Sequence, residues 1–343
     1  MAAVRLVALG VALAFAGWLT AGAPTQPAPE PATLTEVRKL AQVWPSARIV
    51  TSPVRLPDGT DYTPQLYLTA DTSLGTAPGA GGTRLILRRG ADPPRELRQA
   101  LDFAAFTTDG SQLYWAEVAA GTDGRAVTSL WRGDSAVPLV ADAGPALFTT
   151  SQYALQVAGG SLHWVTAGPD ESNTTELRSV PVGGSGAVRL RPLPDLFALS
   201  AWPWLVSTST ARGPLDLLNV DTGQRVRVPV SAAETAVCGP TWCRLRVVTQ
   251  SGVSRLDLMR PDGSDRHRIA GGTFTASAPD VALLDRFELM SSGEQVRSLR
   301  LYDEKRRTIV AVADEATGIT ARNGKLWWSS AGSWHVLDLA TLQ

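Results

Sequence analysis

The sequence predicts an all-β protein built as a single β-propeller, with one short helix near the N-terminus. Three observations support this fold class. From residue 60 onward, short apolar or alternating segments are separated by Gly, Asp and Pro, a pattern typical of many short strands. A segment rich in aromatic residues recurs about every 40 to 50 residues. No long segment of helical periodicity interrupts this pattern.

The recurring aromatic segment marks the repeating unit of the predicted propeller. Its copies are Gln65–Leu68, Gln112–Trp115, Ser161–Trp164, Trp204–Val206, Trp242–Leu245, Phe287–Met290 and Lys325–Trp328. A second alternating strand follows each copy, such as Ser129–Asp134, and a third short strand comes next, such as Val137–Val140. Three or four strands in a unit of this length match one propeller blade. We therefore expect seven blades, with six as the alternative.

The last unit of the repeat is expected to take one strand from the start of the domain. The sequence ends at Gln343, soon after the second strand of this unit, so that an outer strand is missing there. Residues 46–56 could supply it and leave no open edge in the ring. The sequence thus predicts closure of the ring by an N-terminal strand.

Residues 1–23 have the character of an export signal. An almost unbroken apolar stretch, residues 6–23, follows Arg5, and Ala21–Ala23 fits the small-residue pattern at which signal peptides are cleaved. A cleaved signal peptide is the first interpretation. A membrane anchor formed by residues 6–23 is the alternative, because a stretch of this length can nearly cross a bilayer. Both interpretations place the domain outside the cytoplasm, either secreted or anchored to the membrane.

Two short segments are expected between the export signal and the repeats. Residues 24–33 are rich in proline and predict an extended linker. Thr35–Trp44 carries apolar residues at helical spacing, which predicts a short amphipathic helix packed on the domain as a lid. A partner-binding helix is the alternative. The propeller domain itself is expected to span residues 34–343.

Composition limits the classes of partner. The chain has 32 basic and 32 acidic residues, so no net field draws it to nucleic acid. A chain of 343 residues, 44% of them hydrophobic, is long enough to bury a large core as one domain. We expect no nucleic-acid partner.

The two cysteines are the most specific local feature of the sequence. Cys238 and Cys243 flank a short segment with the turn residues Gly239 and Pro240, and strand-like residues lie on both sides. In an exported chain this pair predicts a disulfide that staples a hairpin. Redox catalysis favours two intervening residues instead of four, and a metal site needs more ligands.

No catalytic, cofactor-binding or metal-binding residue is predicted. His163, His267 and His335 each stand alone in a strand or turn, without the neighbours that orient a catalytic base. The sequence contains no Gly-x-Ser-x-Gly motif and no phosphate-binding loop. Acidic turns such as Asp262–Asp265 could bind calcium, but a calcium site needs six or more converging oxygens, so we expect solvated turns instead. The arginines within Arg84–Arg98 indicate a solvated blade exterior.

Several of these segments resemble known propeller families. Arg255–Ile269, with its Pro-Asp-Gly turn, resembles the repeats of TolB-like propellers. The Leu-Tyr-Trp segment ending at Trp115 and the Leu-Trp-Trp segment ending at Trp328 resemble YWTD-type blades. The whole chain is similar to exported actinobacterial propellers of unassigned function. The resemblance implies a fold and a compartment, and it implies no chemistry.

We therefore expect a non-enzymatic extracytoplasmic module that binds a protein or a cell-envelope partner through one face of the propeller. Function in such folds depends on sites carried by the loops, so the fold does not name the ligand. One alternative is a secreted enzyme, such as a metal-dependent hydrolase or lactonase that uses the central channel. Another is a structural component of the cell envelope, held at the membrane by residues 6–23.

Overall fold

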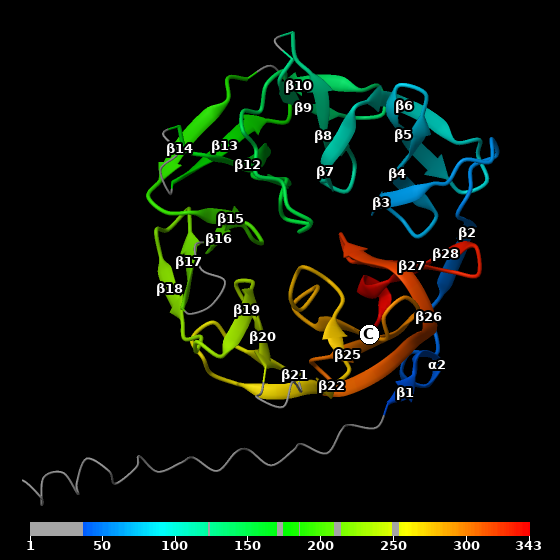
Figure 1. The fold of residues 1–343 in the computed structure, drawn as a ribbon, viewed down its shortest axis with the longest axis vertical. Helices are drawn as coiled ribbons and strands as arrows, with labels where there is room; N and C mark the ends of the chain where they lie inside the picture. Colours follow the sequence, from blue (N-terminus) through cyan, green and yellow to red (C-terminus); the bar gives the residue numbers. More distant parts are fainter. Residues whose placement is uncertain (1–36, 123, 170–173, 185, 209–213, 249–253) are drawn as a thin grey trace, which may run out of the picture. The chain divides into compact units, whose positions relative to one another are not determined.

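Antiparallel sheets arranged around a common centre make up the folded chain (Figure 1). The computed structural model describes residues 37–343 except 123, 170–173, 185, 209–213 and 249–253. The expected export segment and proline-rich linker lie outside the described residues. In the part that the structure describes, no helix is long and apolar enough to cross a membrane.

Five sheets each consist of four consecutive strands, so neighbours in the sheet are also neighbours in the chain. The first two sheets contain β3 (Thr63–Tyr67), β4 (Thr72–Gly79), β5 (Gly82–Arg89), β6 (Arg95–Ala100), β7 (Asp102–Thr108), β8 (Leu113–Ala120), β9 (Ala126–Arg132) and β10 (Val137–Val140). The next three contain β11 (Gln156–Ala158), β12 (Ser161–Ala167), β13 (Thr175–Pro181), β14 (Arg189–Leu193), β15 (Phe197–Leu199), β16 (Trp204–Ser207), β17 (Leu215–Asn219), β18 (Arg225–Val228), β19 (Glu234–Cys238), β20 (Cys243–Val248), β21 (Ser254–Met259) and β22 (His267–Gly272).

The remaining strands form two further blades that share one long strand. This shared strand is β26 (Thr308–Arg322), whose first part pairs with β25 and whose last part pairs with β27. From β26 the strands continue through β25 (Arg297–Asp303) and β24 (Phe287–Ser292) to β23 (Thr275–Ala276) on one side, and through β27 (Lys325–Ser330) to β28 (Ser333–Asp338) on the other. A short 3-10 turn, η1 (Leu339–Thr341), follows β28. The structure therefore has seven blades, as the repeat predicts, and not six.

The N-terminal strand β2 (Ile49–Pro53) closes the ring. It pairs antiparallel with β28 over its whole length, from Ile49 opposite Leu337 to Pro53 opposite Ser333. The last blade thus combines three strands from the end of the chain with one from its start. The prediction that residues 46–56 supply the missing outer strand is confirmed.

The buried core lies between blades. The buried hydrophobic residues that the structure describes form seven clusters, and each cluster joins two adjacent blades. Trp115, for example, belongs to the second blade and packs with Leu74 and Leu85 of the first. Another cluster joins the last blade to the first and contains Trp327 and Tyr62. Each small sheet buries its two faces against its neighbours, so stability depends on the complete ring.

The predicted N-terminal helix is much shorter in the structure. The sequence predicts a helix over Thr35–Trp44, and residues 35 and 36 lie outside the described residues. In the described part of this span the structure has β1 (Arg38–Lys39), paired in parallel with β26, followed by the four-residue helix α2 (Leu40–Val43). Pairing with the edge of β26 satisfies backbone groups that a longer helix would have bonded internally. The segment still packs on the domain, because Trp44 is 3% exposed and its ring lies edge-on to Phe287.

The first aromatic segment occupies a different strand from the other six. Those six fall in the second strand of their blades, at β8, β12, β16, β20, β24 and β27, whereas Gln65–Leu68 falls in β3, the first strand. The second strand of that blade, β4, has Gly75 where the ring of Tyr62 lies. A Cβ at Gly75 would be 2.6 Å from Cζ of Tyr62. The aromatic ring that fills this position comes from the preceding segment of chain.

Candidate functional site

The two cysteines take the arrangement that the sequence predicts. Cys238 ends β19, Cys243 begins β20, and the two residues lie opposite each other in the hairpin register. A disulfide joins them, and both side chains are buried in the core between the fourth and fifth blades. The pair therefore staples a hairpin and presents no thiol to a ligand.

Two of the three histidines occupy structural positions. His163 is buried against Trp202, with ring centroids 3.8 Å apart, and its Nε2 lies 3.1 Å from the carbonyl oxygen of Ala158. Burial lowers the pKa of His163, which favours the neutral ring. His335 stacks on Trp328 with centroids 5.5 Å apart. Among the described residues, neither histidine contacts a carboxylate.

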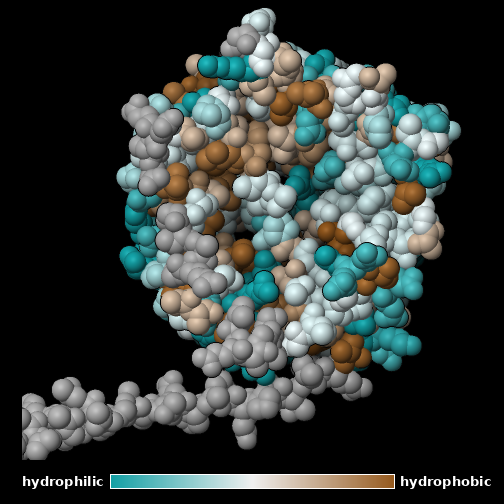
Figure 2. Space-filling view, viewed as in Figure 1, coloured by the Kyte–Doolittle hydropathy of each residue, from teal (hydrophilic) through white to brown (hydrophobic). Residues whose placement is uncertain are grey.

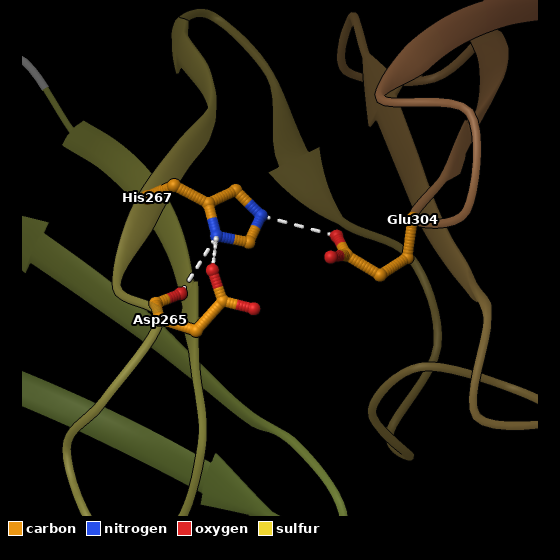
Figure 3. Close-up of side chains that lie close together, drawn as sticks. All are labelled: Asp265, His267 and Glu304. Atoms are coloured by element: carbon orange, nitrogen blue, oxygen red, sulfur yellow. Dashed lines mark hydrogen bonds and ion pairs between the residues drawn. The ribbon is translucent and has the colours of Figure 1, made fainter.

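His267 lies between two carboxylates (Figure 3). Asp265 belongs to the turn between β21 and β22, His267 begins β22, and Glu304 directly follows β25 in the next blade. Atoms of all three side chains lie within 4.8 Å of one another, and no other group of this kind occurs among the described residues. The sequence does not reveal this group, because Glu304 lies 37 positions after His267.

Both ring nitrogens of His267 face oxygen atoms. Nδ1 lies 2.8 Å from the carbonyl oxygen of Asp265, and Nε2 lies 3.0 Å from a carboxylate oxygen of Glu304. A carbonyl or a carboxylate accepts hydrogen bonds, so this geometry suits a ring that donates from both nitrogens, the imidazolium form. Burial alone would lower the pKa of His267, but the hydrogen bonds to Glu304 and Asp265 outweigh it and raise the pKa.

Arg307 already neutralises the two carboxylates. Its Nη2 lies 3.1 Å from Oδ1 of Asp265 and 3.0 Å from Oε1 of Glu304. A metal ion bound by Asp265, His267 and Glu304 would have to displace this guanidinium and remove a proton from the histidine. The three residues can offer ligands to a metal, but their present partners make them an ion-pair cluster that joins the fifth and sixth blades.

At low pH, protonated His267 is expected to stabilise this joint between blades. Its pKa is raised in the folded state, so its contribution is complete below about pH 6.5 and is lost as the pH rises through the folded-state pKa. We expect His267→Gln to lower the free energy of unfolding by about 1 kcal/mol more at about pH 5.5 than at about pH 8.5. Urea unfolding of both chains at the two pH values measures this difference.

His335→Gln is the matched control, because His335 contacts the carbonyl oxygen of Ser330 and no carboxylate that the structure describes. Its cost at each pH is the reference with which the cost of His267→Gln is compared. An equal cost of His267→Gln at both pH values would contradict a charged His267 in the folded protein.

Residues 149–155, called the strap below, precede β11 and form hydrogen bonds to blades on the other side of the ring. Oγ of Ser151 donates to Oδ1 of Asp280 at 2.5 Å, and the backbone N of Gln152 donates to Oδ2 at 2.9 Å. The backbone N of Asn323 donates to the side chain of Gln152 at 3.0 Å. Two small cavities, of about 120 and 170 Å³, border this strap. Burial raises the pKa of Asp280, which the strap covers.

A wide concavity lies over the turns of three blades. It has a volume of about 660 Å³ and is called the turn groove below. It is bounded by the turns β7–β8 and β9–β10 and by the start of the turn after β13, together with residues of the first blade. The larger charged or polar side chains that line it are Arg89, Asp109, Gln112, Tyr114, Arg132 and Asp134.

The turn groove was not predicted from the sequence, because the residues that line it come from three blades. The sequence predicts a solvated blade exterior for Arg89, and the structure shows the side chain half exposed, paired with Asp134 of the next blade at the border of the groove. Hydrophobic and hydrophilic residues are mixed over the face in Figure 2. No sequence signal indicated which turns would meet.

Comparison with known proteins shows the fold. No protein-family model matches the sequence, and no curated protein matches it. An uncharacterized protein from Listeria monocytogenes EGD-e is similar in structure, with a TM-score of 0.54, 10% identity, and coverage of 86% of this chain and 96% of that protein.

A puromycin-hydrolyzing peptidase from Mycobacterium tuberculosis is also similar, with a TM-score of 0.50 and 16% identity. The match covers 85% of this chain, which spans about half (53%) of the peptidase. A protein described as TolB from Agrobacterium tumefaciens matches 71% of this chain and 93% of its own, with a TM-score of 0.41 and 14% identity. The chain is a β-propeller.

Proposed function

We propose that this chain is a non-enzymatic module that acts outside the cytoplasm and binds a segment of a partner protein in the turn groove. The observation that carries this proposal is the groove itself. Its volume of about 660 Å³ lies in the range of ligand sites in proteins. Its walls are turns held by four-stranded sheets, so the site is formed before the ligand arrives.

The lining of the turn groove favours binding over catalysis. The described residues that line it include no histidine and no cysteine. Its two acids, Asp109 and Asp134, are already engaged by hydrogen-bond donors of this chain and offer no free base. The apolar export segment and the disulfide support a position outside the cytoplasm, because disulfides persist in oxidising compartments.

A matched pair of variants tests the proposal. Ser135 is an exposed residue of the turn groove, whereas Gln295 is an exposed residue of the turn between β24 and β25, outside it. We expect peptides selected on the wild-type chain from a random library with free C-termini to bind Ser135→Trp at least about 10-fold more weakly. Gln295→Trp should bind them as the wild type does. Fluorescence anisotropy of labelled peptides measures both affinities.

The proposal fails if the wild-type chain selects no peptide, or if Ser135→Trp binds the selected peptides as tightly as the wild type. Thermal unfolding of both variants shows whether the folded state is retained. A glycine-to-tryptophan change would strain the turn at Gly133, whose φ is 68°, so Ser135 is the better position.

A further inference from the structure

We infer that the turn groove recognises a carboxylate of the partner peptide and that Arg132 is the residue that holds it. This inference rests on the proposed function and names the chemistry of the ligand. It follows from the hydrogen bonds that the groove residues already make and from those that they leave unmade.

The acids of the turn groove already have hydrogen-bond donors or arginines of this chain as partners. Asp109 accepts hydrogen bonds from the backbone N and Oγ of Ser111, from the backbone N of Gln112 and from the hydroxyl of Tyr114, at 2.8 to 2.9 Å. Burial alone would raise the pKa of Asp109, but these hydrogen bonds lower it to about 2. Asp109 therefore remains an ionised carboxylate that shapes the β7–β8 turn.

The second acid is neutralised by two arginines. Nη2 of Arg89 contacts a carboxylate oxygen of Asp134, and Nη2 of Arg95 lies 3.2 Å from the same oxygen. Asp134 thus forms ion pairs with two arginines of this chain. A cationic ligand in the groove would meet no free carboxylate at either acid.

Arg132, in contrast to the two acids, keeps hydrogen-bond donors for which the structure describes no acceptor. Its Nη1 donates to the carbonyl oxygen of Val182 in the next blade, and the structure describes no hydrogen bond or ion pair for its Nε or Nη2. Arg132 lies opposite Tyr114 in the β8–β9 register, and it lines the groove. The bond to Val182 orients the guanidinium, and two N–H donors on one side of a planar fork match a carboxylate.

Residues near Arg132 offer the ligand one more hydrogen-bond donor and an apolar surface. The side-chain amide of Gln112 makes no hydrogen bond to a described residue, so it can donate to the same ligand. Leu68, Leu87 and Val137 also line the groove, and Val137 is 41% exposed. The site thus pairs surplus donors with an apolar wall, which suits a carboxylate beside an aliphatic side chain.

The experiment compares each selected peptide with two neutral versions. One has its acidic side chains changed to amides, and the other has an amidated C-terminus, so the two versions separate side-chain from terminal carboxylates. We expect one of them to bind the wild-type chain about 10- to 100-fold more weakly, because it loses a charged hydrogen bond. Fluorescence anisotropy measures the affinities.

Variants of Arg132 test the proposed bond between this arginine and the peptide carboxylate. Arg132→Gln should lose about 10- to 100-fold in affinity for the acidic peptide and bind the neutral version as the wild type does. Arg132→Lys should recover only part of the loss, since it keeps the charge without the fork. Arg227→Gln, on the exposed outer strand β18, is the control and should leave affinity unchanged.

Two failures are distinguishable. If no peptide binds the wild-type chain, the proposed function is wrong. If peptides bind in a manner that Ser135→Trp blocks, yet neutral versions bind as tightly as acidic ones, the carboxylate inference alone is overturned. The peptide comparison uses the wild-type chain, so its result stands even if Arg132→Gln disturbs folding.

Discussion

Replacing Arg244 with methionine is expected to lower the free energy of unfolding by about 3 to 5 kcal/mol. The side chain of Arg244 is 8% exposed, and its Nη1 lies 2.5 Å from Oε1 of Glu288, which is fully buried. Methionine fills part of the space, and the Glu288 carboxylate then keeps only one hydrogen bond from the residues that the structure describes, from the backbone N of Ala282. An unpaired buried charge costs far more than an exposed one.

The same substitution also releases a loop of the sixth blade. The guanidinium of Arg244 donates to the carbonyl oxygens of Ala278, Pro279 and Asp280, which lie between β23 and β24. Asp280 in turn accepts a hydrogen bond from Ser151 of the strap. We therefore expect the loss to come from both the charge pair and the loop that it organises.

Urea unfolding monitored by tryptophan fluorescence measures the effect of Arg244→Met. Arg227→Met is the control, because Arg227 is exposed on β18, and it should cost less than about 0.5 kcal/mol. Adding Glu288→Leu to Arg244→Met should restore part of the stability, since the double variant removes the unpaired charge. A loss below about 1 kcal/mol for Arg244→Met would show that Glu288 is not held as the structure indicates.

Removal of residues 37–56 is expected to abolish most of the stability of the ring. The comparison is between chains 37–343 and 57–343, and the shorter chain loses β2, its pairing with β28, and the buried side chains of Trp44 and Leu56. Loss of a buried tryptophan alone costs about 3 to 5 kcal/mol. Globular proteins have unfolding free energies of about 5 to 15 kcal/mol, so the combined loss approaches the total.

Thermal and urea unfolding of the two chains measure the effect. Trp44→Ala in the longer chain is the internal control and should give the smaller loss expected for one buried ring. A synthetic peptide of residues 46–56, added to the shorter chain, should restore part of the stability by pairing with the free edge of β28. An unchanged unfolding transition after the truncation would contradict closure of the ring by β2.

Local patterns were sufficient to predict most strands of this protein. The alternation of side chains in a strand and the Gly, Asp and Pro residues of a turn are local patterns. The strand β28 and the turn before it can therefore be predicted without knowledge of their tertiary contacts. The same holds for Cys238 and Cys243, which need only a hairpin to meet. The first blade was misread because Tyr62, outside the expected strand, supplies the ring that other blades take from their second strand.

The fold class, the closing strand and the disulfide were thus predicted from the sequence alone, whereas the choice between seven and six blades came from the structure. Only the tertiary structure decided which residues from different blades meet. Arg244 and Glu288 are 44 positions apart, His267 and Glu304 are 37 apart, and Arg132 reaches Val182 across 50. Strand patterns specify each sheet, but the stacking of the sheets sets these contacts, and the turn groove exists only because the first three blades stack side by side.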